Sequence, residues 1–291
     1  MNSPEIQRIR ISRGDRLTRG VFAVLCVVFL VIFAYPMVYC LWASIYSSGQ
    51  FSLEGYRVLL NSKLVLRGFA NSMYYTLSGT AISLATTVPA AYALSREQFR
   101  SRRLFYRMLV LTNYFGGGIL PTFLLVKKLG MLNTMWALVL PSCVSVYNTK
   151  LLISRFQNSL SQSVYKAAML DGCGHWRYLL TFAVPLTSPS IATVTFSYFV
   201  SYYNAYFAAR LYITKPEKFP LTIILNNLLV KNQAATTLVS SSSAQAVNTA
   251  TMAEYALIII SSLPVMLVFA ILRKRIKTPE REDEGNRGEG L

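Results

Sequence analysis

Long apolar stretches separated by short polar loops dominate the pattern along this chain of 291 residues. No charged residue occurs between Arg19 and Glu54 or between Arg177 and Arg210. Each of these runs exceeds the roughly 20 apolar residues that cross a bilayer as a helix. The pattern predicts six membrane-spanning helices, at residues 21–44, 68–94, 104–126, 135–154, 178–208 and 255–272.

The composition supports a membrane protein, because 53% of the residues are hydrophobic and only 14% are charged. We therefore expect an all-α membrane protein with one transmembrane domain at residues 21–272, a basic amino-terminal segment at residues 1–20 and a tail at residues 273–291. A cleaved signal peptide is the alternative for the first span. The long apolar run and the lack of a small-residue cleavage site disfavour that alternative.

The formal net charge of +17 could indicate a nucleic-acid-binding protein. The positions of the charges argue against nucleic acid and for membrane lipid. Lys and Arg cluster at the amino terminus, at residues 96–107 and after Leu272, where they flank the predicted spans. Because basic residues favour the cytoplasmic side of a membrane, we expect both termini in the cytoplasm.

Catalytic motifs are missing from the sequence, which contains no nucleophile elbow, zinc-protease motif or phosphate-binding loop. The four cysteines show no metal-ligand spacing, and the single histidine, His175, is expected to make structural contacts rather than bind a metal. Ion-coupled carriers keep ionisable residues inside the membrane, whereas only Lys150 and Glu254 come near a span interior here. The chain is therefore expected to be non-enzymatic, without a metal or cofactor of its own, and powered from outside.

A polar loop, "SQSVYKAAMLDGCGHW", separates the predicted fourth and fifth spans. Its first part predicts a short amphipathic helix, with an apolar stripe of Val164, Ala167, Ala168 and Leu170, that ends at Gly172. Because it is connected at both ends to spanning helices, such a helix could transmit the movement of a partner protein to them.

This loop resembles the "EAA…DG…LP" loop of binding-protein-dependent ATP-binding-cassette (ABC) importers, with Pro185 at the final position. The resemblance implies the type I ABC importer permease fold, in which loop 155–180 carries a coupling helix that docks on an ATPase subunit. Lys166 stands where the family usually has glutamate, so a salt bridge there is not carried over. Asp171 would cap or orient the turn. The implied coupling residues are Lys166, Ala167, Ala168, Met169, Leu170, Asp171 and Gly172.

Most of the chain, about residues 15–275, resembles the six-span permeases of the carbohydrate branch, which includes the maltose permease pair. Residues 113–141 resemble permeases for oligosaccharides and uronate polysaccharides such as alginate or aldouronate. The family implies alternating access in a bacterial inner membrane, a second homologous permease, an extracytoplasmic solute-binding protein, and two ATPase subunits that bind ATP and magnesium. The alternatives are another solute, such as a glycerol phosphate or a peptide, and a standalone secondary carrier or membrane scaffold.

Aromatic and amide side chains concentrate in "SYFVSYYNAYF" near the outer half of the predicted fifth span. Sugars bind by stacking on aromatic rings and by hydrogen bonds to amides and hydroxyls. Tyrosines at this depth can instead form an interfacial belt. The residues predicted to line a substrate path are Asn148, Tyr198, Tyr202, Tyr203, Asn204 and Tyr206.

The sequence "YFGGG", residues 114–118, interrupts the predicted third span. Its glycines could provide a hinge or allow close packing between helices. Close packing is the favoured interpretation, because it is the commoner use of glycine in transmembrane helices.

Overall fold

The computed structural model describes residues 13–47, 50–238 and 244–276. The tail from residue 277 lies outside the described residues, as do the first twelve residues. A two-residue antiparallel pair, β1 (Tyr46–Ser47) and β2 (Gln50–Phe51), accompanies a set of helices. The helices are α1 (Arg13–Ile45), α2 (Glu54–Asn61), α3 (Lys63–Ser95), α4 (Arg102–Tyr114), α5 (Ile119–Lys128), α6 (Met135–Val139), η1 (Leu140–Ser142), α7 (Val146–Ser159), α8 (Gln162–Leu170), α9 (His175–Tyr178), η2 (Leu179–Ala183), α10 (Val184–Leu186), α11 (Ser188–Tyr203), α12 (Tyr206–Tyr212), η3 (Pro216–Lys218), α13 (Leu221–Leu238) and α14 (Ala244–Ile276).

Three helices, α1, α3 and α14, are long and apolar enough to cross a membrane unbroken. They contain the predicted spans 21–44, 68–94 and 255–272. Each of the other three predicted spans corresponds to helices joined at a bend. The described chain bends by 112° between α4 and α5, by 53° between η1 and α7, and by 86° between α10 and α11. Length and composition therefore support three spans, or up to six if each bent pair crosses once.

The sharpest bend lies at the glycines of "YFGGG". Gly118 has a φ of +80°, a conformation that favours glycine. An added Cβ would meet no atom within 4 Å at Gly116 or Gly118, and only Pro121 at Gly117. The expected close packing is therefore wrong within this chain, because these residues form a break between two helices.

Proline and hydroxyl residues mark the other two breaks. Pro141 lies in the 3-10 turn η1, before the cap that Ser145 provides for α7 by accepting a hydrogen bond from the Asn148 amide. Thr187 separates α10 from α11, with Pro185 and Pro189 close on either side. Proline lacks an amide hydrogen and clashes with the preceding turn, so a proline near each break favours a bend there.

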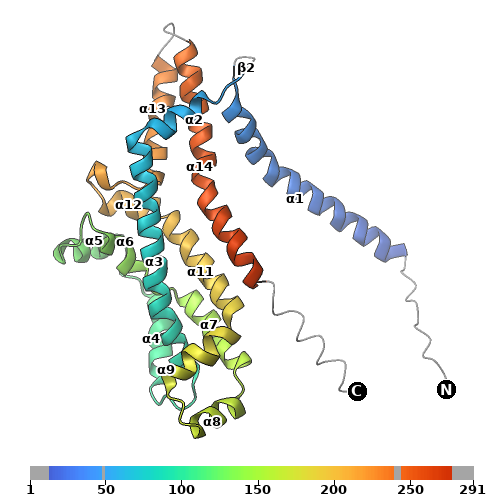
Figure 1. Cartoon of the computed structure of the whole chain (residues 1–291), viewed down its shortest axis with the longest axis vertical. Helices are drawn as coiled ribbons and strands as arrows, with labels where there is room; N and C mark the ends of the chain where they lie inside the picture. The colour runs from blue at the N-terminus through green and yellow to red at the C-terminus, as the bar shows by residue number, and fades with distance from the viewer. Residues whose placement is uncertain (1–12, 48–49, 239–243, 277–291) are drawn as a thin grey trace.

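Helix α3 packs against α7, α11 and α13, and α14 packs against α11 and α13. Helices α2 and α13 lie toward the upper end of the bundle and α8 lies at its lower end (Figure 1). One side of α3 carries small residues that are all buried. Small side chains let two helices approach closely, and hydroxyls can bond across the contact. The buried small residues along α3 are Gly68, Ser72, Thr76, Gly79, Thr80, Ser83, Thr87, Ala91 and Ser95.

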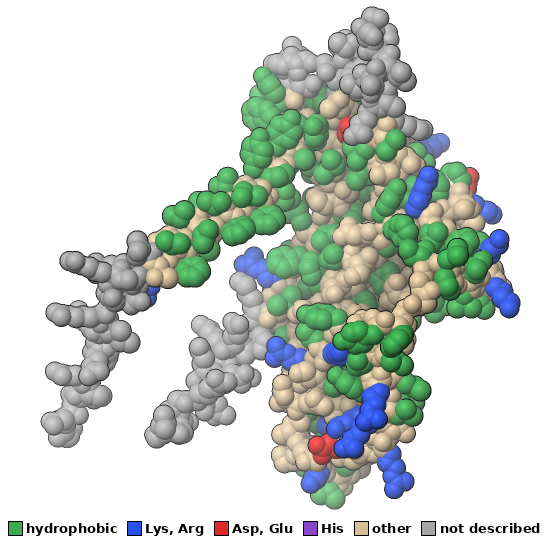
Figure 2. Space-filling view, turned by 180° about the vertical axis from the view of Figure 1, so that it is seen from behind, with side chains coloured by type: hydrophobic (Ala, Val, Ile, Leu, Met, Phe, Trp, Pro, Cys, Tyr) green, Lys and Arg blue, Asp and Glu red, His purple; other side chains and the backbone are tan. Residues whose placement is uncertain are grey.

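Helix α1 diverges from this bundle (Figure 1) and is covered by hydrophobic side chains (Figure 2). None of its most apolar 18-residue window is buried within the chain. Near its carboxyl end Tyr39 meets Tyr255 of α14, with 6.0 Å between the ring centroids. Such an apolar surface requires lipid or another protein around it.

Candidate functional site

The short helix predicted in the polar loop is present as α8, at the lower end of the bundle (Figure 1). Ser161 caps its start by accepting a hydrogen bond from the Val164 amide. At its end the Gly172 amide donates to the Met169 carbonyl at 3.1 Å, and the Cys173 amide donates to the Ala168 carbonyl at 2.9 Å. This pair of bonds is a Schellman motif, which requires the φ of +76° found at Gly172.

The predicted apolar stripe of α8 does not form one face. Tyr165 and Ala168 are turned toward the bundle and are only 5% and 9% exposed. Val164 and Leu170 are 47% and 88% exposed, so both point away from the bundle. The stripe prediction failed because it placed Val164 and Leu170 on the face of Ala168 and omitted Tyr165, which supplies most of the buried surface. The exposed coupling residues are Lys166, Ala167, Leu170, Asp171 and Gly172, and Met169 is half-buried.

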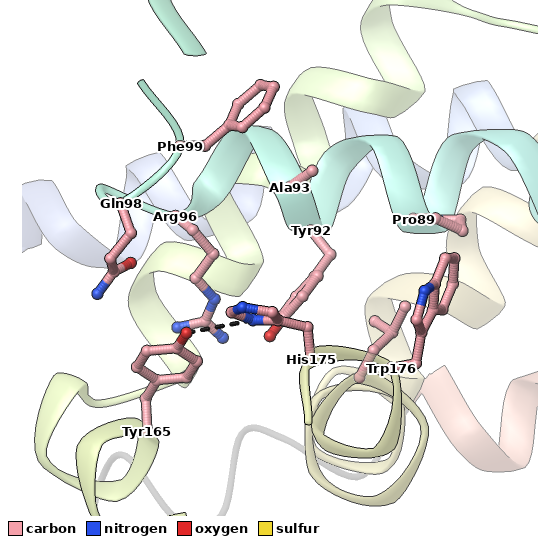
Figure 3. Close-up of a pocket in the computed structure, with 10 residues that line it drawn as sticks. Pro89, Tyr92, Ala93, Arg96, Gln98, Phe99, Tyr165, His175 and Trp176 are labelled. Carbon is pink, nitrogen blue, oxygen red and sulfur yellow. Dashed lines mark hydrogen bonds between the residues drawn. The ribbon is translucent and has the colours of Figure 1, made fainter. Parts of the chain in front are cut away.

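Arg96, directly after α3, joins this long helix to α8 and α9. Its guanidinium carbon lies 4.7 Å from the ring centroids of Tyr92 and Tyr165 and 5.2 Å from that of Tyr178. The Nε and Nη2 atoms of Arg96 are buried without a hydrogen-bond partner. Attraction between the cation and the ring faces therefore holds this group in place. Figure 3 shows the guanidinium group directed toward Tyr165 and Tyr92.

A mainly apolar cavity of about 480 Å³ lies beside this cluster, between the end of α3 and the start of α9 (Figure 3). His175 and Trp176 line it from the α9 side, and Pro89 and Ala93 line it from α3. The His175 Nδ1 atom lies 3.3 Å from the Tyr165 hydroxyl, and the two rings stack. The expected contact role of His175 is therefore what the structure shows.

The tyrosines predicted to line a substrate path occupy two different environments. Tyr198, Tyr202 and Tyr203 are buried between helices, at 2%, 8% and 5% exposed, which does not fit an interfacial belt facing lipid. Their hydroxyl groups are used inside the chain. Tyr198 bonds to Thr87 at 2.8 Å, Tyr202 bonds to Ser83 at 2.8 Å, and Tyr203 donates to the Ser261 carbonyl at 2.7 Å.

The other three predicted path residues are placed differently. Asn148 is buried at 3% exposed near the start of α7. Asn204 is exposed in the turn between α11 and α12, and the half-buried Tyr206 donates a hydrogen bond to Asn226 at 3.0 Å. The structure thus does not bring all six residues into one cavity, and their contact with a substrate stays a prediction.

Comparison with known proteins decides the family. The chain is 32% identical over 224 residues to the polygalacturonan/rhamnogalacturonan transport system permease protein YtcP of Bacillus subtilis, covering 77% of this chain and 78% of that protein. A solved structure of a bacterial ABC transporter involved in import of the acidic polysaccharide alginate superposes with a TM-score of 0.79 at 30% identity. That match covers 90% of this chain and 98% of the other.

This chain belongs to the family of sugar ABC transporter permeases. A second alginate ABC transporter structure, in complex with an alginate-pentasaccharide-bound periplasmic protein, has a TM-score of 0.55 at 14% identity and shares the fold. That match covers 91% of this chain and 97% of the other. No family model matches the chain.

One feature of this permease, the set of contacts made by Arg96, was not found from its sequence. Arg96 was treated only as one of the basic residues flanking a span, although it forms contacts to three aromatic rings. The signal that could have identified it is the sequence "AYALSREQF", in which Tyr92 lies four residues before Arg96 on the same side of a helix. The contacts with Tyr165 and Tyr178 depend on the tertiary fold, because those residues are about 70 and 80 positions further along the chain.

Proposed function

We propose that this permease forms one half of the translocation path of an importer for acidic, uronate-containing oligosaccharides. The observation that carries the proposal is the likeness to the alginate importer, which extends over 98% of that chain at 30% identity. The named substrate of the similar Bacillus subtilis permease, polygalacturonan, is also a uronic acid polymer. Both of these similar proteins are thus named for glycans that carry carboxylates.

Helix α8 is the proposed coupling helix. Its Schellman end fixes Gly172 and Asp171 at the exposed tip, while Tyr165 and Ala168 attach the opposite face to the bundle. Leu170 is 88% exposed, which suits an apolar contact made with another subunit. We propose that these outward residues seat in a groove of an ATPase subunit that supplies the ATP and magnesium chemistry.

The path for sugar is proposed to lie between this chain and a second, homologous permease. The cavity next to Tyr202 and Tyr203 within this chain has a volume of only about 10 Å³, which is room for about one water molecule. A sugar unit therefore needs a surface completed by another subunit. The exposed apolar helix α1 offers area for such a partner or for lipid.

A periplasmic solute-binding protein is the proposed source of the substrate, because the second alginate transporter structure contains such a protein with a pentasaccharide bound. We place both termini on the cytoplasmic side of a bacterial inner membrane, because Lys and Arg concentrate in those segments. Helix α8 is placed on the same side, because it lies in the loop between the fourth and fifth of the six predicted spans. ATP binding would turn the path outward to the binding protein, and hydrolysis would return it inward.

ATP turnover by the reconstituted importer tests the substrate proposal. The permease is co-expressed with its neighbouring subunits and placed in lipid vesicles with the binding protein. Oligomers of mannuronate, guluronate or galacturonate should stimulate ATP turnover, and neutral maltooligosaccharides of the same length should not. Stimulation by the neutral oligomers alone, or by peptides or glycerol phosphates, would overturn the acidic-sugar proposal.

Co-purification tests the coupling proposal separately. Leu170→Asp would place a charge in the proposed apolar contact, so it should reduce retention of the ATPase subunits severalfold. Gln162→Asp is the matched control, because Gln162 is exposed at the start of the same helix, where an acidic side chain is favoured. Equal ATPase retention by the two variants would exclude α8 as the docking element.

A further inference from the structure

A second cavity, lined in part by three cations, lies between the start of α4 and the later part of α7. Its volume is about 290 Å³. Arg102, Arg103 and Lys150 line it, and Leu94 and Ile153 provide apolar lining. The hydrogen-bonding groups among its lining residues are those of Tyr106, Ser154 and Gln157. This cavity is distinct from the Arg96 cluster, which lines the apolar cavity beside α9.

The three cations of this cavity have no anionic partner in the described part of the chain. None of their side chains forms an ion pair, a side-chain hydrogen bond or a ring contact with another described residue. Glu97 and Arg102 both line an adjacent cavity of about 330 Å³ without forming an ion pair there. Lys150 is half-buried, so its charge has lost part of its water. Arg102 is also half-buried and Arg103 is exposed, so three like charges lie close together, and their mutual repulsion is relieved when an anion joins them.

The cavity lies at the expected level of the cytoplasmic membrane surface. Arg102 and Arg103 come just before the predicted third span, and Lys150 comes four residues before the end of the predicted fourth. From this level α4 continues as a helix that buries none of its residues within the chain. Its outward surface is apolar, with Leu104, Met108 and other large side chains about half exposed. The cavity has room for a phosphate-bearing headgroup and adjoins an apolar strip along α4, and these two features match the two parts of a phospholipid.

We propose that Arg102, Arg103 and Lys150 bind the phosphate of an anionic phospholipid from the cytoplasmic leaflet. Arginine offers paired donors that match phosphate oxygens, and lysine adds a compact charge. Basic pockets between membrane helices on the cytoplasmic side are suited to anionic headgroups. The acyl chains lie along the exposed side of α4. This site does not depend on which sugar the importer carries.

Lipid retention by the purified importer, assembled with its partner subunits, tests this site. The complex is placed in nanodiscs of phosphatidylcholine with or without phosphatidylglycerol, and the lipid that remains after mild detergent treatment is measured by native mass spectrometry. The wild type should retain phosphatidylglycerol in preference to phosphatidylcholine. Arg103→Gln with Lys150→Gln should weaken that preference roughly thirtyfold, which is about fivefold for each cation near an anionic surface.

Two further variants separate a lost site from lost folding. Lys128→Gln with Lys215→Gln removes the same charge from exposed positions outside the cavity and should keep the preference. Arg103→Lys with Lys150→Arg retains both charges and should restore most of it. A preference that survives in the double glutamine variant, or that fails to return in the charge-retaining variant, overturns the proposal.

Competition distinguishes the lipid from other anions. Inorganic phosphate and a uronate oligosaccharide are each added to the complex that carries phosphatidylglycerol. Retention of the lipid in both cases is the expected result, since the acyl chains add binding area that neither competitor has. Displacement by free phosphate would make this a phosphate site rather than a lipid site. Displacement by the uronate oligosaccharide alone would place the three cations on the sugar path.

Discussion

The guanidinium carbon of Arg96 lies 4.7 Å from the centroid of the Tyr165 ring. This contact attaches the end of α3 to the buried face of α8, the helix proposed to meet the ATPase. Because α3 is also the helix against which α7 and α11 pack, a displacement of α8 would reach the centre of the bundle through a short chain of contacts. Such a rigid connection is what coupling between two subunits requires.

Replacing Arg96 by glutamine should uncouple sugar recognition from ATP turnover. Each cation–ring contact contributes on the order of 0.5–2 kcal/mol, and this substitution removes three of them. We expect substrate-stimulated ATP turnover to fall roughly tenfold, while basal turnover and subunit assembly persist. Arg96→Lys should give an intermediate result, because it keeps the charge but loses the planar group that stacks on the rings.

Arg100→Gln is the control for this prediction. Arg100 is exposed in the same loop and contacts none of the three rings, so its replacement changes the net charge equally. Wild-type stimulation in Arg96→Gln would show that the cluster is only a structural contact. An equal loss in both variants would point to the charge of the loop instead.

The end of α8 gives a second prediction, concerning Gly172. A side chain there has free space but would have to adopt a φ of +76°, at a cost of about 1–2 kcal/mol. Gly172→Ala should therefore loosen the tip of α8 and lower uptake severalfold. Gly172→Trp should abolish uptake while insertion into the membrane continues, because the bulky side chain also blocks the proposed docking surface.

Gly174→Ala is the matched variant, since Gly174 has a φ of −68° and equally open surroundings. It should behave like the wild type in an uptake assay. Full uptake together with normal ATPase retention in Gly172→Trp would remove this tip from the coupling surface.

The sequence predicted the elements whose signals are local. Hydrophobic length located α1, α3 and α14, and the residues "MLDG" located the end of α8 at a glycine. The bends were missed because the length of an apolar run does not show whether the helix within it changes direction. At Gly118 and Thr187 the decisive feature is backbone geometry, and at the glycines the sequence alone favoured close packing over the break that the structure shows.

The candidate site was predicted only in part, for a similar reason. A helix end is set by a few neighbouring residues, so Gly172 could be recognised. The buried face of α8 is set by Tyr165, whose partners Arg96 and Tyr178 come from other elements. The same holds for Tyr202, whose aromatic ring suggested a sugar contact but whose hydroxyl is bonded to Ser83 of α3.

The contact between α3 and α11 supplies a stability prediction at Gly79. A Cβ at this position would lie 2.9 Å from the Tyr202 ring, which cannot simply rotate away because its hydroxyl is bonded to Ser83 at 2.8 Å. Gly79→Ala should destabilise the permease by about 1–3 kcal/mol, as expected for overpacking.

Gly20→Ala, at an open helical position on α1, should leave the melting temperature unchanged or slightly higher. A thermal melt of the detergent-purified complex compares them, and equal melting temperatures would show that α3 and α11 are not tightly packed there.

The last prediction separates the amide of Asn204 from the hydroxyl of Tyr203 in substrate selection. Asn204 is exposed beyond the end of α11, whereas the Tyr203 hydroxyl is bonded to the Ser261 carbonyl. A hydrogen bond or ring contact to sugar contributes on the order of 1–2 kcal/mol. Asn204→Ala should therefore raise the oligosaccharide concentration for half-maximal ATP turnover roughly tenfold, with basal turnover intact. Tyr203→Phe should leave that concentration unchanged, and it avoids the cost of deleting a buried ring. If Asn204→Ala kept the wild-type dependence on every acidic oligosaccharide tested, the sugar would have to pass along another part of the chain.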